Sequence, residues 1–179
     1  MNDKALLVID MQNDFVTGTL ANAEAQNITS AIAAKVKQCE TEGVPVFFTR
    51  DTHDEDYLKS QEGKLLPVPH CKVGTDGWQV VPELVDFVKE GQEGNVFDKP
   101  TFGSMYLPTW LHEKLNGTPS IIELCGVCTD ICVISNAMIL KAAFPETEIV
   151  VDGNICAGVT PENHQTALDA MKSCQINVK

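Results

Sequence analysis

The sequence contains no long hydrophobic run. Nowhere in its 179 residues do apolar side chains approach the length of about eighteen residues that a membrane-spanning helix needs. Residues 1–4 lead directly into a strand-like segment and carry no signal-peptide pattern. We therefore expect a protein without a membrane span or a secretory signal, located in the cytoplasm.

Positive charge is also scarce. The chain has 13 Lys and Arg residues against 25 Asp and Glu residues, which gives a net charge of −12. A nucleic-acid-binding surface needs clustered Lys and Arg side chains, so this composition argues against a nucleic-acid partner. It leaves the chemistry of a small-molecule substrate open.

An evenly paired set of cysteines is absent as well. The seven cysteines are an odd number, and most of them fall within strand-like or helix-like segments, which argues against a disulfide framework. The hydrophobic share of 44% and the charged share of 21% are typical of a globular protein, and no internal repeat or linker interrupts the chain. We predict one domain over residues 1–179, long enough to bury a core without covalent cross-links.

Short apolar runs alternate with helix-like segments along the chain. We expect strands at residues 5–9, 44–49, 95–97, 120–124, 148–151 and 175–178. Helices are expected at residues 23–42, 82–89, 107–115, 129–143 and 161–172, with a long irregular section between the second strand and Trp78. Strands that alternate with helices predict an α/β domain whose parallel sheet is covered on both faces.

Chemically useful side chains follow several of the expected strands. In a parallel α/β sheet, ligands bind beyond the carboxyl ends of the strands. The side chains expected there belong to Asp10, Asp51, His53, Lys99, Cys128 and Cys132. We predict that these residues converge on one site.

Residues 120–133, SIIELCGVCTDICV, suggest a nucleophile at this site. An apolar strand ends at Gly126, and Thr129 is placed to cap the next helix. Cys132 then falls at the third helical residue, where unpaired backbone N–H groups and the helix dipole favour the thiolate. We interpret Cys132 as a nucleophile; the alternative is a small buried residue.

A cysteine nucleophile needs a base and a group that fixes the base. Asp10 is placed for the first role and Lys99 for the second. An aspartate beside a lysine is expected to stay ionised with a lowered pKa, so its basicity requires a site partly closed to water. The alternatives are a turn or capping residue for Asp10 and a solvated surface charge for Lys99.

A second group of polar side chains has the composition of a metal site. Asp51 and His53 are two residues apart, so in an extended segment both can point to one side. His70 adds a second imidazole, and Glu62 lies between them in the chain. Such nitrogen and oxygen ligands suit zinc, iron and manganese. The alternative is a polar loop whose histidines bond to backbone carbonyls.

Five segments, in order, resemble a known family. They are LLVIDMQNDF (6–15), FFTRDTH (47–53), PHCKVGTDGW (69–78), FDKPTFGSM (97–105) and GVCTDICV (126–133). Over essentially its whole length the chain resembles the isochorismatase-like cysteine hydrolases, and within them the nicotinamidases. The resemblance implies a three-layer α/β/α sandwich with a six-stranded parallel sheet, and often a homo-oligomer.

The resemblance also implies a mechanism. Asp10, Lys99 and Cys132 match the catalytic triad of the family, and a cis peptide is implied between Val127 and Cys128. The backbone N–H groups of Cys128 and Cys132 would form an oxyanion hole. The expected reaction is hydrolysis of a small amide through a cysteine thioester, with release of ammonia.

The resemblance further assigns a metal and a substrate. Asp51, His53 and His70 match the metal ligands of nicotinamidases, with Glu62 as a fourth ligand, so we expect a divalent metal, zinc first and iron or manganese as alternatives. Nicotinamide is the preferred substrate, which would place the protein in NAD salvage. The alternatives are another small amide or an N-carbamoyl compound, with an empty or structural metal cluster, and a non-enzymatic role for a retired hydrolase.

The chain departs from the family in the expected substrate pocket. Many nicotinamidases have an aromatic residue three positions before the second histidine ligand, where this chain has Pro67. We expect the pocket to be lined instead by Phe15, Leu20, Leu66 and Tyr106.

Overall fold

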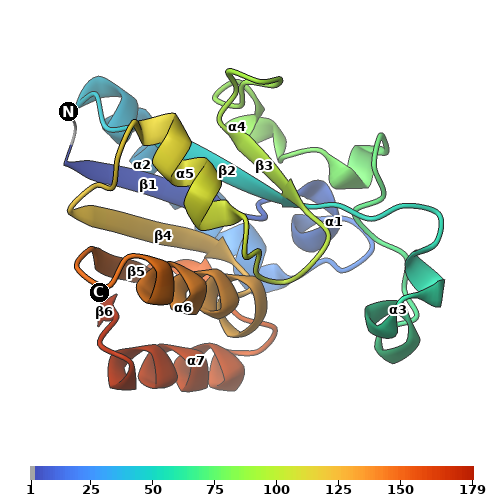
Figure 1. Ribbon diagram of the computed structural model, residues 1–179. Helices are drawn as coiled ribbons and strands as arrows, with labels where there is room; N and C mark the ends of the chain where they lie inside the picture. The colour runs from blue at the N-terminus through green and yellow to red at the C-terminus, as the bar shows by residue number, and fades with distance from the viewer. Residues whose placement is uncertain (1–2) are drawn as a thin grey trace.

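The computed structural model describes residues 3–179, which form a six-stranded parallel sheet (Figure 1). The strand order is β3-β2-β1-β4-β5-β6. The strands are β1 (Lys4–Ile9), β2 (Val46–Asp51), β3 (Val96–Lys99), β4 (Ile121–Val127), β5 (Glu148–Ala157) and β6 (Asn177–Val178). The predicted α/β class and the six-stranded parallel sheet are confirmed.

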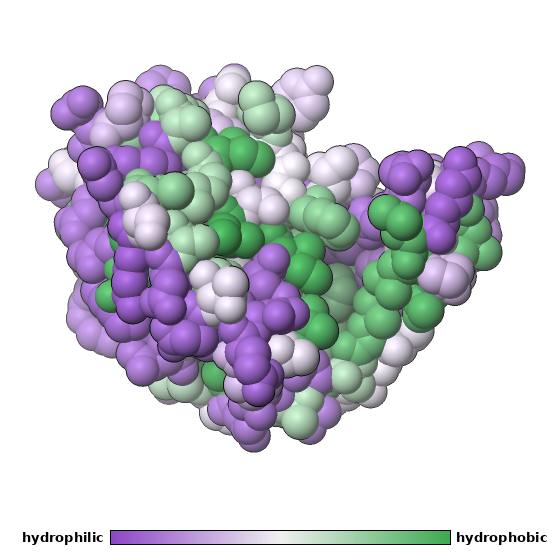
Figure 2. All heavy atoms as spheres, turned by 90° about the horizontal axis from the view of Figure 1, so that it is seen from below, coloured by the Kyte–Doolittle hydropathy of each residue, from purple (hydrophilic) through white to green (hydrophobic). Residues whose placement is uncertain are grey.

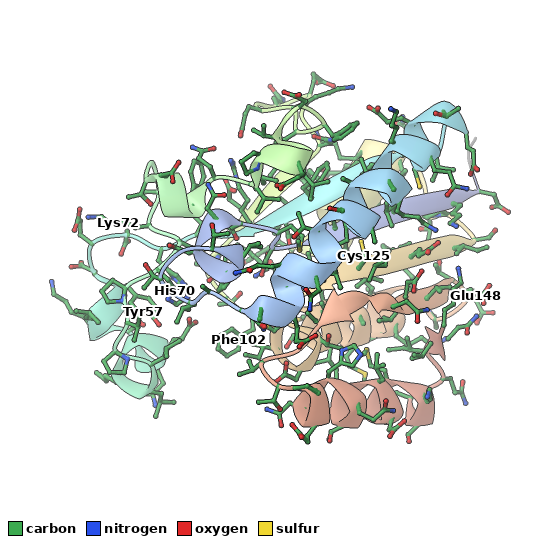
Figure 3. The ribbon with its side chains drawn as sticks, turned by 180° about the vertical axis from the view of Figure 1, so that it is seen from behind. Tyr57, His70, Lys72, Phe102, Cys125 and Glu148 are labelled. Carbon is green, nitrogen blue, oxygen red and sulfur yellow. The ribbon has the colours of Figure 1, made fainter. Side chains whose placement is uncertain are left out.

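Helices cover both faces of the sheet. The longer ones are α2 (Ala23–Thr41), α5 (Leu107–Leu115), α6 (Ile134–Ala143) and α7 (Pro161–Ser173). Helix α2 crosses one face, while α5 and α6 lie on the other (Figures 1 and 3). Helix α7 packs against α6 and the edge of the sheet at β5 and β6. This is the expected three-layer arrangement.

Short helical pieces fill the connections. They are α1 (Asn13–Val16), α3 (Gln61–Leu65), α4 (Pro82–Val85), the 3₁₀ turns Tyr57–Lys59 and Asp76–Trp78, and a π-helical turn, η3 (Thr129–Val133). The helix expected at residues 82–89 is therefore only one turn long. The expected irregular section contains α3, which projects from the body of the molecule (Figure 1). No helix within residues 3–179 is long and apolar enough to cross a membrane.

The two central strands bring the ends of distant segments together. Ile9 of β1 is in register with Gly126 of β4, so Asp10 and Cys128 follow at the same edge of the sheet. The prediction that the strand ends at Gly126 is wrong, because β4 continues to Val127. Gly126 has φ +113°, and a Cβ there would lie 2.1 Å from the carbonyl oxygen of Ile9. Glycine at this position therefore allows the two strands to approach closely.

The helical residues 129–143 are confirmed, but the prediction that Thr129 caps the helix is wrong. Cys128 is the N-cap residue: its backbone is extended, and its side chain makes no capping hydrogen bond. The chain first forms the π-helical turn η3 and continues as α6 from Ile134. The Thr129 hydroxyl lies 2.8 Å from the Nδ1 of His164 instead, so a tertiary contact has replaced the local cap.

Candidate active site

The side chains of Asp10, Lys99 and Cys132 meet at the carboxyl edge of the sheet. Asp10 follows β1, Lys99 ends β3, and Cys132 lies in η3. The Lys99 Nζ is 2.6 Å from Asp10 Oδ2, and both side chains are fully buried. The Cys132 thiol is also buried, close enough to both groups for each to act on its pKa. The structure thus brings the three predicted catalytic side chains together.

Asp10 is held by β2 as well as by Lys99. The Thr49 hydroxyl donates a hydrogen bond of 2.6 Å to Asp10 Oδ1. Burial raises the pKa of Asp10, and this effect exceeds the opposing effect of the Lys99 ammonium. The expectation of a lowered pKa is therefore wrong, because complete burial penalises the carboxylate. The result is a carboxyl group that is more basic than an exposed aspartate.

Burial also dominates the pKa of the thiol. It raises the pKa of Cys132 well above the usual range, and the negative charge of Asp10 adds to the effect. The expectation that the helix terminus favours a thiolate is therefore wrong for the resting site. Cys132 requires a base at the moment of attack, and Asp10 is the neighbouring group that can accept its proton.

The turn after β4 presents two backbone N–H groups beside the thiol. The peptide between Val127 and Cys128 is cis. The Cys128 carbonyl accepts hydrogen bonds of 3.0 Å from the N–H groups of Ile131 and Val133, which fold the turn back on itself. In the part of the chain that the structure describes, the Cys128 N–H donates to no backbone carbonyl. It is available to a ligand in the cavity that Cys128 and Cys132 line.

The four candidate metal ligands also converge. One ligand atom from each of Asp51, His53, Glu62 and His70 lies within 4.8 Å of the others. Asp51 Oδ2 is 3.0 Å from His53 Nε2 and 3.2 Å from His70 Nε2. Asp51 Oδ1 and Glu62 Oε1 are buried without a hydrogen-bond partner among the described residues, as expected of oxygens that await a cation. Two imidazoles and two carboxylates fit zinc, iron or manganese.

Residues around this cluster orient the ligands. The His70 Nδ1 lies 2.8 Å from the carbonyl oxygen of Val68, which leaves Nε2 to face the other ligands. The Gln12 side chain bonds both the N–H and the carbonyl of Asp51, at 2.7 and 2.9 Å. The Asp14 carboxylate accepts a hydrogen bond of 2.7 Å from the N–H of Cys71. Sequence reasoning did not single out Gln12 or Asp14, although they follow Asp10 at intervals of two.

A cavity of about 460 Å³ joins the two groups of side chains. Phe15, Leu20 and Leu66 line it, as predicted, together with Cys132 and with Asp51, Glu62 and His70 of the metal cluster. The prediction for Tyr106 is wrong: its side chain is 78% exposed and lies outside the lining, because α5 starts at the next residue and turns it outward. Phe102 lines the cavity instead and was missed. Figure 3 shows Phe102 beside the segment that carries Tyr57 and His70.

A second cavity of about 970 Å³ adjoins the first. Glu62, Leu66, Phe102 and Ile131 line both cavities and therefore lie between them. Figure 2 shows the surface hollowed between the body and the projecting segment around α3, with hydrophobic residues along the hollow.

The sequence also does not predict the role of Asn136, which lies beside the nucleophile in α6. Its Nδ2 donates to the carbonyl oxygens of Cys132 and Phe102, at 2.8 and 3.0 Å. Its Oδ1 accepts a hydrogen bond from the N–H of Ser104. The side chain thus links the nucleophile turn to the loop that carries Phe102. Nothing in the sequence distinguishes this helical asparagine from one that faces solvent.

Comparisons with known proteins agree with this arrangement. A family model of the isochorismatase domain matches residues 4–178. An uncharacterized isochorismatase family protein, PncA of Bacillus subtilis, is 36% identical over 171 residues, which cover 92% of each chain. The crystal structure of nicotinamidase/pyrazinamidase PncA from Bacillus subtilis has a TM-score of 0.85 at 31% identity, covering 99% of both chains. The structure of pyrazinamidase/nicotinamidase from Streptococcus mutans has a TM-score of 0.81 at 32% identity, covering 98% of this chain and 99% of that one.

Proposed function

Because this chain belongs to the isochorismatase family, we propose that it is a nicotinamidase that hydrolyses nicotinamide to nicotinate and ammonia. One observation carries the proposal. A single cavity is lined both by Cys132, whose partners Asp10 and Lys99 are buried, and by Asp51, Glu62 and His70 of the metal cluster. An amide on a pyridine ring has two features to be held, its carbonyl carbon and its ring nitrogen. Relatives above 30% identity that carry the name nicotinamidase support the same substrate.

The first chemical step is attack by Cys132. The Cys132 Sγ bonds to the carbonyl carbon of the amide while its proton passes to Asp10. Burial raises the pKa of both groups, which keeps Cys132 as a thiol and makes Asp10 a stronger base for its proton. The backbone N–H groups of Cys128 and Cys132 would stabilise the oxyanion of the tetrahedral intermediate.

The remaining steps return the enzyme to its starting state. Asp10 gives its proton to the leaving ammonia, and a Cys132 thioester remains. Asp10 then accepts a proton from water, which attacks the thioester. The C–S bond breaks, Asp10 returns its proton to the Cys132 sulfur, and the acid leaves as nicotinate after losing its own proton to solvent. Lys99 stays charged throughout: burial disfavours its ammonium, but Asp10 and its other neighbours raise the pKa of Lys99 above the ordinary value. Its charge holds Asp10 in place through the 2.6 Å contact.

Asp51, His53, Glu62 and His70 would hold a divalent metal, with zinc as the first candidate and iron or manganese as alternatives. When bound, the metal would supply a coordination position for the ring nitrogen of the substrate. Phe15 and Phe102, which line the cavity, would contact the faces or edges of the ring. The ring would then be fixed with its amide toward Cys132. Nicotinate production would make the protein part of NAD salvage.

A different amide is the second candidate. The position of the family's pocket aromatic is occupied by Pro67, and the adjoining wall is the aliphatic Leu66 with a cavity of about 970 Å³ behind it. A wall of this kind leaves room for another small amide or an N-carbamoyl compound. Such a substrate has no pyridine nitrogen and would not depend on the metal cluster.

Ammonia release from nicotinamide by the purified protein tests the proposal, with and without prior chelation. The expected result is rapid release that chelation abolishes and added zinc, iron or manganese restores. Release from nicotinamide that survives complete removal of metal would show that nicotinamide hydrolysis does not need the metal cluster. If nicotinamide gives no ammonia while another small amide does, nicotinamidase activity is excluded and the cysteine hydrolase remains.

A further inference from the structure

The turn that carries Cys128 and Cys132 is attached to α7 by a contact that the proposed mechanism leaves unused. The Thr129 Oγ1 lies 2.8 Å from the Nδ1 of His164, the fourth residue of α7. Thr129 is fully buried, and His164 is half-buried. A buried hydroxyl that loses its partner is costly, so this hydrogen bond constrains Thr129 strongly.

A second contact ties the next residue of the turn to the same region. The Asp130 carboxylate accepts a hydrogen bond of 2.9 Å from the N–H of Val159, just before α7. The neighbouring Gly158 packs so closely on α7 that a Cβ there would lie 2.9 Å from the Cα of His164. The start of α7 and the loop before it thus pack together and support η3, the turn that carries Cys132.

Thr129 is well placed to control the geometry of the oxyanion hole. It directly follows Cys128, and it begins the π-helical turn in which Cys132 lies. The two proposed oxyanion donors therefore lie on either side of Thr129 along the chain. A displacement of Thr129 would separate N–H groups that must point at one oxygen atom, and misplacement by about 1 Å can reduce a rate about 100-fold.

We propose that His164 is a positioning residue for the oxyanion hole: through Thr129 it holds the turn so that the N–H groups of Cys128 and Cys132 converge. The inference rests on the proposed cysteine hydrolase function but not on nicotinamide as the substrate. Burial lowers the pKa of His164, with Asp130 and Glu24 opposing the shift, so the ring is neutral at pH 7. A neutral ring pairs with the threonine hydroxyl through one nitrogen, a role that the amide of asparagine can reproduce.

Two reactions of Cys132 separate this role from a general structural one. Acylation by p-nitrophenyl acetate forms an S–C bond through a tetrahedral oxyanion and releases p-nitrophenolate. Alkylation by iodoacetamide forms an S–C bond by direct displacement of iodide and develops no oxyanion on the protein. In both, the thiol proton is taken up by Asp10 or solvent. The Cys132→Ala variant supplies the background from the remaining cysteines.

We expect His164→Leu to slow acylation of Cys132 by about 10- to 100-fold, the range for an impaired oxyanion hole. Alkylation should change by less than about twofold. His164→Asn should recover most of the acylation rate. Thr129→Val should slow acylation as much as His164→Leu does and leave alkylation equally unaffected. Because the two residues share one contact, the double variant should be no slower than either single variant.

His112→Leu is the matched control. Its Nδ1 lies 3.0 Å from the Thr118 Oγ1, which is the same type of pair, but it is exposed and precedes β4 at the opposite end of the sheet. Both rates should stay unchanged in this variant. The inference is overturned if His164→Leu leaves acylation unchanged, or if acylation and alkylation fall together. Failure of the wild type to hydrolyse nicotinamide would instead refute the proposed substrate, since both probe reactions still report on the turn.

Discussion

At the scale of single residues, the candidate site depends on a buried ion pair beside an unionised thiol. Asp10 and Lys99 form an ion pair with no solvent exposure, and Cys132 lies beside them as a thiol of raised pKa. Burial thus keeps a basic carboxyl and an unionised nucleophile in contact. Proton transfer between them becomes favourable only as negative charge develops on a substrate oxygen that the backbone N–H groups can hold.

Cys132→Ala should abolish amide hydrolysis, because Cys132 supplies the attacking thiol in the proposed mechanism. Cys128→Ala is the matched control, since its proposed contribution is a backbone N–H group that alanine retains. We expect it to keep activity within about a fewfold of wild type. Ammonia release and thermal unfolding of both variants check the prediction. Substantial turnover by a folded Cys132→Ala protein would refute the assignment of the nucleophile.

Phe102→Ala should weaken binding of an aromatic amide. Loss of an aromatic contact of about 0.5–1.5 kcal/mol corresponds to a KM increase of about 2- to 13-fold, with kcat little changed. Phe102 is 44% exposed and lines the cavity, whereas Tyr106 is 78% exposed and does not. Tyr106→Ala should therefore leave KM unchanged. The roles of the two residues would be reversed if only the Tyr106 variant raised KM.

At the scale of elements, one buried carboxylate joins the two central strands to α2 and the C-terminus. Glu123 of β4 is fully buried and lies 2.6 Å from the Lys4 Nζ of β1, 2.8 Å from the Lys35 Nζ of α2 and 3.5 Å from the Lys179 Nζ. Burial raises the pKa of Glu123, but the hydrogen bonds from Lys35 and Lys4 outweigh it and lower that pKa to about 2. The ionised form therefore stabilises the folded state.

Glu123→Gln should destabilise the protein in a pH-dependent way. The pKa of Glu123 is lowered from 4.5 to about 2, so its contribution is complete above pH 4.5 and is lost as the pH falls toward 2. The shift corresponds to on the order of 3 kcal/mol at pH 7, which should decrease to about 1 kcal/mol near pH 3. Urea unfolding of wild type and variant at both pH values measures the difference.

The exposed Glu148 on the neighbouring strand β5 provides the control. It is the first residue of β5 and lies at the amino end of that strand (Figure 3), and its carboxylate accepts a hydrogen bond from Asn177. Glu148→Gln should change the free energy of unfolding by less than about 0.5 kcal/mol. A Glu123→Gln variant that is as stable as wild type at pH 7 would show that the three lysines merely offset the cost of burying the carboxylate.

Most elements of the fold could be predicted from the sequence because their patterns are local. Helix α2, for example, has Asn22 as its N-cap and a regular apolar face. The predicted range 23–42 has the observed start and ends one residue later than the helix does. Strand β5 is longer than predicted, since polar residues from Asp152 to Asn154 interrupt its apolar pattern while the backbone stays extended. Thr129 failed as a predicted cap because its partner, His164, lies 35 residues away.

The positions of site residues could be predicted from the sequence where those residues lie at or just after the carboxyl ends of strands. Asp10 and Lys99 could be placed at one edge of the sheet from the pattern alone, but their roles came from the family resemblance. Phe102 and Asn136 could not be found, because their contacts depend on how a loop packs against a helix. The raised pKa of Asp10 was missed because the sequence reveals its charged neighbour but not its complete burial.

At the scale of the whole molecule, the metal cluster joins the projecting segment to the body. Asp51 ends β2 of the sheet, whereas Glu62 comes from α3 and His70 from the loop after it. The ring of Tyr57 packs on the rings of His53 and His70, at centroid distances of 4.5 and 5.1 Å. A bound cation would thus stabilise the attachment of residues 54–70, including the cavity wall at Leu66.

Metal binding should therefore raise the thermal stability of the protein. At a free zinc concentration of about 100 times Kd, the expected gain is about 2.7 kcal/mol, or a Tm increase of about 5–11 °C for a chain of this size. His53→Ala should bind less metal and lose the increase, while His112→Ala, an exposed histidine, should retain it. Hydrogen exchange gives a second measurement, because bound metal should slow exchange within residues 54–70 more than in the central strands. Equal Tm increases in wild type and His53→Ala would mean that zinc binds elsewhere, and would remove the metal from the proposed mechanism.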